Sequence, residues 1–579
     1  MTGRRWWHDA VVYQIYPRSF CDLSGDGVGD LAGIAAHLDH VADLGVDALW
    51  LSPVFPSPMA DFGYDVADYC GIDPLFGDLD RFDALVGAAH QRGLKVVLDW
   101  VPNHTSDAHP WFVEARSSRH QPRRDWYIWR DDRPDSAGGT GPPGSPGRVP
   151  NNWKAAFPGV GRREFPPAWT YDPDSGQWYL HLFLDRQPDL NWAHPEVQAA
   201  MADTLRFWLE RGVDGFRMDV IHDIGKDAAL ADLPADLAAI PMCALIDYPV
   251  THDLVAGIRA VVKSAPPPDR VVIGEIVLPT VAQVASYHGR PERPELDLAF
   301  NFHPLHAPWS AGAWRRQIDD AAGVIEAAGG WPTWVLSNHD NRRHRTRYGT
   351  EARARAAAVL LLTLRGTPFL YAGEELGLAD AEIPPGRQVD PGGRDGCRAP
   401  LPWDGSPGHG WAGRPWLPWP PEAAAGRTVA GQSSDPGSTL NLYRRLLAAR
   451  RASPALTAGT FEWLGSGPGA LAYRRSWPGA TPTGCAAGSG PATAAGSGSD
   501  QRVVAVNFGD SATWAALPPG GWVVEVGTSV VGEGAGRRWQ ERVELAADEA
   551  VLLRPGGEGF SRAAGAAPSA PPGSGNRCR

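Results

Sequence analysis

Carboxylic acids and imidazoles stand where short apolar runs of this sequence end. A single carboxylate in such a place is most simply a helix N-cap, but here the arrangement recurs in five runs. Several carboxylates, an arginine and two histidines brought to one place are hard to explain as caps, and they indicate a catalytic site. The groups are, in chain order, Asp99, Asn103, His104, Arg217, Asp219, Glu275, His339, Asp340, Glu374 and Glu375.

Paired carboxylates suit the hydrolysis of a glycosidic bond. One carboxylate attacks the anomeric carbon, and a second, protonated carboxyl group donates its proton to the leaving oxygen. The acid needs a raised pKa, which burial and neighbouring carboxylates supply, whereas the nucleophile must stay ionised. Arg217 precedes Asp219 by two residues, and positions two apart on a strand share a face, so Arg217 is placed to keep Asp219 ionised.

The elements that carry these groups alternate between apolar strands and helices. Helical stretches such as 78–93 and 196–212 separate the runs, and Gly93 and Gly212 stop those helices. The pattern predicts an α/β fold in which eight parallel strands form a (β/α)₈ TIM barrel, with the chemistry at the carboxyl ends of the strands. A doubly wound open sheet is the rival, weakened because no GxGxxG follows the first strand. The eight runs are 11–20, 46–53, 94–104, 213–220, 270–276, 296–302, 333–340 and 367–375.

Two segments do not follow the alternation of strands and helices, and they predict further domains. The stretch between the third and fourth runs is too long for a βα connection, so we expect a small domain inserted after strand 3. Short alternating strands near the C-terminus predict an all-β antiparallel sandwich, interrupted by an Ala/Gly/Ser-rich loop. The predicted divisions are a barrel of 1–104 and 196–436, an inserted subdomain B of 105–195, a C-terminal domain of 437–555 with a disordered loop at 479–500, and a disordered tail of 556–579.

Charge, apolar runs and cysteine spacing indicate which partners and which cellular compartment to expect. The 579 residues carry a net charge of −12, which disfavours nucleic acid and anionic membranes as partners. No apolar run has the length of a signal sequence or a membrane span, which favours the cytoplasm. The six cysteines form no CxxC pair, so we expect free thiols. The oligomeric state has no signal in the sequence.

Four short segments, in order, resemble the α-amylase superfamily, glycoside hydrolase family 13. They are DWVPNH (99–104), GFRMD (215–219), GEI (274–276) and SNHD (337–340), and QPDLNW (187–192) resembles a further signature of the family. The likeness covers roughly residues 8–405 and is strongest to the α-glucosidase and oligo-1,6-glucosidase branch.

The resemblance implies a role for each catalytic group. Asp219 would be the nucleophile, Glu275 the acid/base, and Asp340 the third carboxylate, which grips the sugar hydroxyls. Arg217 would hold Asp219 ionised. His104 and His339 would hydrogen-bond the innermost glucose.

The resemblance also implies how the pocket is closed. DFGYD (61–65) and GRDGCRAPLPW (393–403) are similar to loops of exo-acting members, in which an aspartate and an arginine pair behind one sugar. Here these residues would be Asp61 and Arg398, and Tyr64 would stack on the sugar. Phe157, Phe183 and Gln187 match pocket-lining positions, although the segment 158–169 departs from the family pattern there.

The loop 22–31 copies part of a cation-binding pattern. Acidic or oxygen-bearing residues recur at alternate positions as in an EF-hand, but the twelfth position is Gly33 instead of glutamate. In this family branch the loop resembles a structural Ca²⁺ or Mg²⁺ site; catalysis itself requires no cofactor. The implied ligands are Asp22, Ser24, Asp26, Val28 through its carbonyl, and Asp30.

The function predicted is an exo-acting, retaining α-glucosidase for small α-glucoside substrates such as maltose, isomaltose and sucrose. Two alternatives stay open: a transglucosidase or sugar isomerase that forms trehalose or isomaltulose, and a non-catalytic scaffold, which the three retained carboxylates disfavour. In the branch that the sequence resembles, valine after the nucleophile, here Val220, is common in α-1,6-acting members. DFGYD and the long segment 158–169 instead resemble α-glucosidases that act on maltose or sucrose, so α-1,4-linked disaccharides are expected first while α-1,6 linkage stays open.

Overall fold

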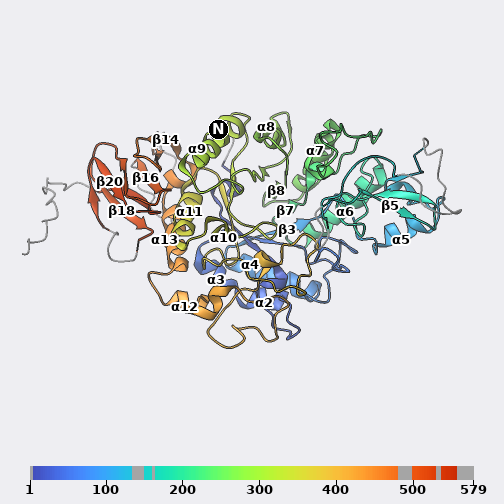
Figure 1. Cartoon of the computed structure of the whole chain (residues 1–579), viewed down its shortest axis with the longest axis horizontal. Helices are drawn as coiled ribbons and strands as arrows, with labels where there is room; N and C mark the ends of the chain where they lie inside the picture. The colour runs from blue at the N-terminus through green and yellow to red at the C-terminus, as the bar shows by residue number, and fades with distance from the viewer. Residues whose placement is uncertain (1–3, 134–148, 159–163, 480–498, 530–535, 557–579) are drawn as a thin grey trace, which may run out of the picture.

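The computed structural model describes residues 4–133, 149–158, 164–479, 499–529 and 536–556. A central barrel carries a small three-stranded domain at one end and a β-domain at the other, as Figure 1 shows along the long axis. The predicted loop 479–500 and tail 556–579 lie almost wholly outside the described residues. At their edges, strand β16 already begins at Asp500.

Eight parallel strands form the barrel sheet, which confirms the predicted (β/α)₈ fold. Their order is β11-β8-β7-β3-β2-β1-β13-β12, so each strand lies beside its neighbour in the chain's βα sequence. All eight predicted runs contain one of these strands. The strands are β1 Val12–Ile15, β2 Ala48–Leu51, β3 Lys95–Trp100, β7 Gly215–Met218, β8 Val271–Gly274, β11 Leu298–Ala299, β12 Thr333–Val335 and β13 Thr367–Tyr371.

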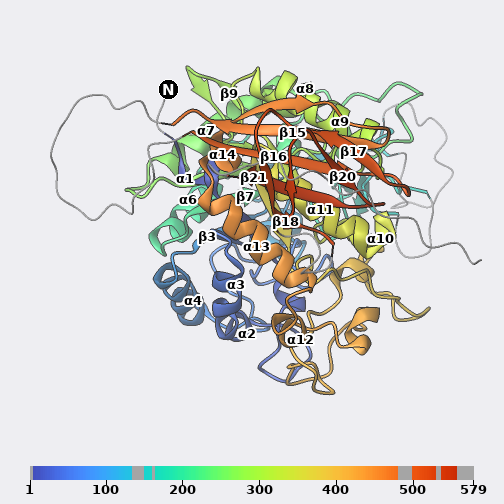
Figure 2. The ribbon, with the colours of Figure 1, turned by 90° about the vertical axis from the view of Figure 1, so that its left-hand side faces the viewer.

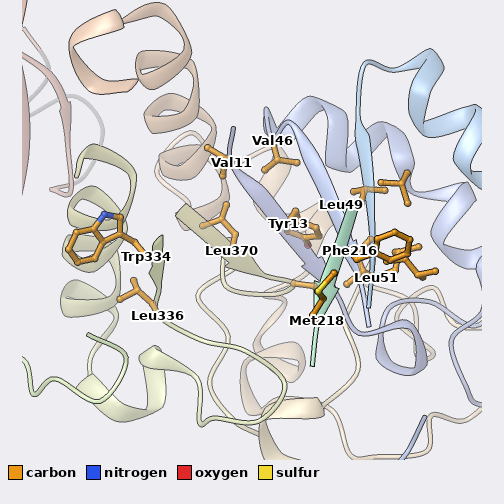
Figure 3. Close-up of a cluster of buried hydrophobic side chains, with 14 of the residues drawn as sticks. Val11, Tyr13, Val46, Leu49, Leu51, Phe216, Met218, Trp334, Leu336 and Leu370 are labelled. Atoms are coloured by element: carbon orange, nitrogen blue, oxygen red, sulfur yellow. The ribbon is translucent and has the colours of Figure 1, made fainter. Parts of the chain in front are cut away.

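Strand alternation separates two apolar layers. One set of side chains fills the barrel interior, including Val12, Trp50 and Val97. The other set faces the surrounding helices, and Tyr13 and Leu49 belong to it (Figure 3). Polar groups that continue the interior set therefore emerge at the mouth of the barrel, because successive side chains of a strand alternate between its faces.

A side chain bridges the two strands at the ends of the sheet order. Thr333 Oγ1 on β12 donates to Ala299 O on β11 at 2.8 Å and accepts from Asn301 N at 3.1 Å. This threonine links strands 6 and 7 of the barrel.

Helices surround the barrel, and several of them begin with an N-cap side chain. Asp78 accepts from Arg81 N at the start of α4, and Thr350 accepts from Arg353 N at the start of α11. The helices that follow the barrel strands, with those of the long loop after β13, are α2 Leu31–Ala36, α3 Leu38–Leu44, α4 Leu79–Gln91, α6 Pro195–Glu210, α7 Pro249–Lys263, α8 Val281–Ser286, α9 Ala311–Asp320, the π-helix η5 Ala321–Glu326, α10 His344–Tyr348, α11 Glu351–Thr363, α12 Val429–Ser433 and α13 Thr439–Ala452.

Helix α13 begins just after the predicted boundary at 437, which stays a prediction, and it contacts both the barrel helices and strand β18 of the β-domain. The helix packs against α11 and α3 on the outside of the barrel, where it supplies the helix that follows the eighth strand. Figure 2 shows it below the β-domain strands. The short helix α14 (Pro454–Ala458) packs on strands β15 and β16 of the β-domain.

The inserted segment folds around a three-stranded antiparallel sheet. Strands β4 (Trp129–Arg130), β6 (Gln177–Leu180) and β5 (Trp169–Asp172) pair in that order, and α5 (Pro110–Ser117) precedes them. Its core is rich in tryptophan and includes Leu230, Met242 and Ile246 from the loop after β7. The inserted domain thus packs directly on a loop that borders the barrel mouth.

The C-terminal domain has two antiparallel sheets. The larger has the order β14-β15-β16-β21-β18-β19, and β17 pairs with β20 in the smaller one. Five of these strands match predicted runs, whereas β17, β19 and β20 were not predicted. The strands are β14 Thr460–Leu464, β15 Ala470–Trp477, β16 Asp500–Asn507, β17 Thr513–Ala516, β18 Trp522–Gly527, β19 Arg538–Trp539, β20 Arg542–Leu545 and β21 Ala550–Pro555.

Within the described part of the chain, Cys21, Cys70, Cys243 and Cys397 are free thiols. Among the same residues, no helix combines the length and apolar character that a bilayer crossing requires.

Candidate active site

A cavity of about 460 Å³ opens at the carboxyl ends of the barrel strands. Its size falls in the usual range for small-molecule sites. Eight of the twelve predicted catalytic and substrate-binding residues line it: Asp61, Tyr64, His104, Phe157, Phe183, Asp219, Glu275 and Asp340. The other four, Gln187, Arg217, His339 and Arg398, are buried behind the wall.

One arginine holds three carboxyl groups at the base of this cavity. Arg217 Nη1 donates to Asp219 Oδ1 at 2.7 Å and to Asp99 Oδ1 at 2.8 Å. Its Nη2 donates to Glu275, which also accepts from Val220 N at 3.1 Å. Because these side chains continue the interior face of β3, β7 and β8, the alternation of the strands alone brings them together.

The charge of this cluster favours retention of a proton near neutral pH. Burial raises the pKa of Asp219, against the opposing charge of Arg217, and it raises the pKa of Asp99 to about 6. The positive charge of Arg217 opposes the rise in the pKa of both Asp219 and Asp99. A site that contains both a carboxylate and a carboxylic acid can supply a nucleophile and a proton donor.

Val220 has a strained backbone next to Asp219. Its φ is 34°, a left-handed conformation that is costly for a β-branched residue. This conformation directs the Val220 N–H toward Glu275. The hydrogen bond at this strained position thus connects the end of β7 to Glu275, which follows β8.

Arg394, and not Arg398, pairs with Asp61 in the wall of the cavity. Arg394 Nη2 donates to Asp61 Oδ1 at 2.5 Å, and its Nη1 donates to Asp340 Oδ1 at 2.9 Å. Arg398 is fully buried one helical turn further on, where it donates to His339 O at 2.8 Å and contacts Asp390 and Asp340 at 3.2 and 3.3 Å. The short helix η6 (Asp395–Arg398) separates the two arginines, so only Arg394 reaches the cavity.

The two arginines hold Asp340 in its ionised form. Burial by itself raises the pKa of Asp340, but the positive charges of protonated His339, Arg394 and Arg398 outweigh it and hold the pKa below its usual value. Burial lowers the pKa of His339 to about 3, so its imidazole is neutral at pH 7. At that pH the two guanidinium groups maintain the charge of Asp340.

The remaining predicted residues form the closed end of the cavity. Gln187 Nε2 lies 3.1 Å from Asp61 Oδ2 and 3.0 Å from His104 Nε2. Tyr64 stacks on His339, with ring centres 5.1 Å apart, and donates to Asp99 at 3.0 Å. The predicted stacking of Tyr64 on a sugar stays a prediction, and its position in the wall permits it.

Two phenylalanines form an aromatic part of the wall. Phe183 lies 5.1 Å from the His104 ring and 5.9 Å from Phe157. The guanidinium of Arg394 lies over Phe157 at 4.7 Å. In the segment 158–169, residues 159–163 are outside the described part, and Phe165 lines the cavity.

Lys226 supports the site and has no counterpart in the sequence-based prediction. Its Nζ donates to Asn103 Oδ1 at 2.5 Å and pairs with Asp189 Oδ2 at 2.8 Å, and it also donates to Asp223 O. These contacts join the end of β3, the inserted domain and the loop after β7. No residue pattern marks the lysine, since its partners lie far apart in the chain.

The loop 22–30 directs its carboxylates at backbone amides. Asp22 accepts from Gly25 N at 2.7 Å and from Gly27 N at 2.9 Å, Asp30 caps α2 through Gly33 N, and Asp26 accepts from Val28 N. No group of three or more His, Cys, Asp or Glu side chains within the described ranges is arranged to hold a metal ion. As they lie, these residues do not form a cation cage, and the structural Ca²⁺ or Mg²⁺ stays a prediction.

Comparison with known proteins identifies relatives over most of the chain. The "Alpha amylase, catalytic domain" family model matches residues 14–459. A "Probable alpha-glucosidase" of Rhizobium meliloti (strain 1021) is 42% identical over 507 residues, which are 82% of this chain and 87% of the relative. An "Oligo-1,6-glucosidase" of Parageobacillus thermoglucosidasius is 36% identical over 506 residues, 79% of this chain and 86% of the relative.

A solved structure has the same architecture. The crystal structure of an "alpha-glucosyl transfer enzyme, XgtA" is 39% identical in sequence and superposes with a TM-score of 0.81. The match covers 96% of this chain and 100% of the other. Together with the family match and the carboxylates at the mouth of the barrel, this likeness leads to one conclusion: the chain belongs to the α-amylase family of glycoside hydrolases, in its α-glucosidase and oligo-1,6-glucosidase branch.

Proposed function

We propose that this enzyme is an exo-acting, retaining α-glucosidase that releases terminal α-linked glucose from small oligosaccharides. The observation that carries the proposal is the bridge of Arg394 between Asp61 and Asp340, at 2.5 and 2.9 Å. In the proposed function, this bridge would close the cavity behind the terminal glucose. An endo-acting enzyme needs a cleft that continues past this position, whereas an exo-acting enzyme needs a closed end.

The proposed mechanism is a double displacement. Asp219 attacks the anomeric carbon of the terminal glucose, and Glu275 donates its proton to the glycosidic oxygen as that bond breaks. A water molecule then attacks the glucosyl–Asp219 ester while Glu275 takes the water's proton, and free glucose leaves with its α-configuration. Two inversions give net retention. Both carboxyl groups bond the same guanidinium, which supports the short separation, about 5–5.5 Å, of retaining enzymes.

The other polar residues of the closed end would bind the glucose itself. Asp340, ionised through its two arginine neighbours, would accept hydrogen bonds from sugar hydroxyls, and so would Asp61. His104 would contribute a further hydrogen bond beside Gln187. Such contacts would be strongest when the ring flattens toward the oxocarbenium-like transition state.

Transfer of the glucosyl group is the second candidate function. The named relative with a solved structure is an α-glucosyl transfer enzyme, and the same glucosyl–Asp219 intermediate would serve both reactions. Phe165, Val277 and Phe302 give the cavity wall an apolar part that could hold an acceptor and exclude water. A sugar isomerase would use the same intermediate with the released sugar as acceptor.

Product analysis separates these functions. The purified enzyme would be given maltose, isomaltose, sucrose, trehalose and soluble starch separately at pH 7, and the products would be resolved by chromatography. The proposal expects glucose from the disaccharides and almost none from starch. New disaccharides without net glucose would establish transfer or isomerisation instead, and rapid fragmentation of starch would refute exo attack.

A further inference from the structure

The loop after β11 runs from the cavity to the C-terminal domain. Phe302 and His306 in this loop line the cavity. Three residues after His306, Trp309 packs against the C-terminal domain, and Ser310 then caps helix α9. Figure 1 shows α9 beside the β-domain. A single short segment therefore touches both the substrate cavity and another domain.

The contact of Trp309 with the C-terminal domain is specific. Its indole Nε1 donates to Asp548 Oδ1 at 3.2 Å, and its ring centre lies 4.3 Å from that of Phe508. Asp548 is also held by Arg353 Nε, at 3.1 Å from each carboxylate oxygen. Asp548 has a φ of 52°, so the turn between β20 and β21 presents this carboxylate in a left-handed conformation.

The sheet order places this loop across the barrel from the closed end. In the ring of eight strands, β11 lies four positions from β2, and Asp61 and Tyr64 follow β2. Phe302 and His306 therefore form the wall opposite the residues that close the cavity. Under the proposed exo attack, that wall faces the leaving group and not the terminal glucose.

The loop has little freedom to absorb a shift of its anchor. Pro304 and Pro308 fix two backbone angles, and Arg347 donates to Leu305 O in the middle of the segment. Beyond Leu305, the stretch that carries His306 ends at Trp309. Loss of the contact between Trp309 and Asp548 would therefore displace His306 first.

We propose that Trp309 and Asp548 are positioning residues through which the C-terminal domain sets the leaving-group wall of the cavity. The inference rests on the proposed exo-glucosidase function, because that function assigns one side of the cavity to the terminal glucose and the other to the leaving group. It assigns to the β-domain a role in selecting the substrate's leaving group, beyond its contribution to stability.

The test compares two substrates that differ only beyond the terminal glucose. Maltose places a sugar against the leaving-group wall, whereas α-glucosyl fluoride places only a fluoride ion there. The measured quantity is the ratio of kcat/KM for maltose to kcat/KM for α-glucosyl fluoride. Trp309→Phe and Asp548→Gly should each lower the ratio by about tenfold, the usual scale of discrimination by a pocket wall. Glycine tolerates the left-handed backbone, so the second variant removes the carboxylate without strain.

Trp463→Phe is the matched control. Trp463 Nε1 donates to Asp319 Oδ1 at 2.7 Å, so the control also removes one indole–aspartate bond between the β-domain and the barrel. Trp463 is not on a cavity loop, and its variant should keep the wild-type ratio. His306→Ala, which alters the wall directly, should lower the ratio.

Each outcome is decisive. A wild-type ratio in both Trp309→Phe and Asp548→Gly, while His306→Ala lowers it, would refute the positioning role. A wild-type ratio in His306→Ala would refute the assignment of this wall to the leaving group. An equal fall in Trp463→Phe would show a general effect of the domain interface. Failure of the wild-type enzyme to release glucose from either substrate would instead refute the proposed function.

Discussion

Replacement of Arg394 by alanine tests the closed end of the cavity. The guanidinium serves three carboxylates: Asp61 at 2.5 Å, Asp340 at 2.9 Å and Asp390 at 2.6 Å. Its side chain is only 10% exposed, so solvent screens these contacts little. The variant leaves Asp61 buried without its ion-pair partner, because Arg398 is bonded to Asp390 and Asp340 instead.

The expected loss follows from the cost of a buried unpaired charge. Removal of one partner from such a pair costs about 3–5 kcal/mol. Since about 1.4 kcal/mol corresponds to a factor of ten, a loss of this size in substrate binding should lower kcat/KM for maltose by about two to three and a half orders of magnitude. Most of the loss should appear in KM, because Asp61 and Asp340 would bind the glucose before as well as during the reaction.

The assay is initial-rate kinetics on maltose, with a thermal melt to show that the variant folds. Arg394→Lys should recover only part of the loss, because an ammonium keeps the charge but not the fork that bridges two carboxylates. Arg387→Ala serves as the control and should match the wild type, because the Arg387 side chain lies in the same loop but donates to Trp416 O, at 3.3 Å, and not to the three carboxylates. A folded Arg394→Ala enzyme whose kcat/KM lies within about threefold of the wild type would refute the reasoning.

Three further predictions concern other parts of the molecule. Asp219→Asn should lower kcat by more than about a thousandfold, and retention of a tenth of the activity would remove Asp219 from the nucleophilic role. Burial raises the pKa of Glu374 to about 8, so the folded enzyme binds a proton there that the unfolded chain releases near pH 4.5, and stability falls as pH rises between these values. Glu374→Gln should therefore flatten the dependence of Tm on pH between about 5 and 8, and an unchanged slope would contradict the assignment. If the loop 22–30 holds a structural cation, excess EDTA should lower Tm without a change in kcat at 25 °C, and an unshifted melt would mean that no chelatable ion stabilises the loop.

The barrel could be predicted from the sequence because its signals are local. Each strand is a short apolar run; Asp219 and Glu275 each stand one residue beyond their strands, and Asp340 stands five residues beyond β12. Asp219 and Glu275 thus reach the same guanidinium although 56 residues separate them in the chain. The fold followed from these patterns, whereas the family and the role of each catalytic group followed from the short segments that resemble the family.

The parts that were wrong or missing depend on geometry that is not local. Arg394 and Arg398 lie one helical turn apart in the same segment, and only the path of η6 decides which of them reaches Asp61. The boundary at 437 stays a prediction, because α13 packs on α3 and α11 of the barrel and also on β18 of the β-domain, and composition does not reveal such packing. Lys226 gains its role solely from partners on three separate segments.

The central claim, retention through a covalent intermediate at Asp219, is tested most directly by following maltose hydrolysis with proton NMR before the released glucose equilibrates. The account predicts that α-glucose appears first and that the β-anomer rises only later, by mutarotation. Initial release of β-glucose would mean a single inversion by water, and it would contradict the double displacement by Asp219 and Glu275.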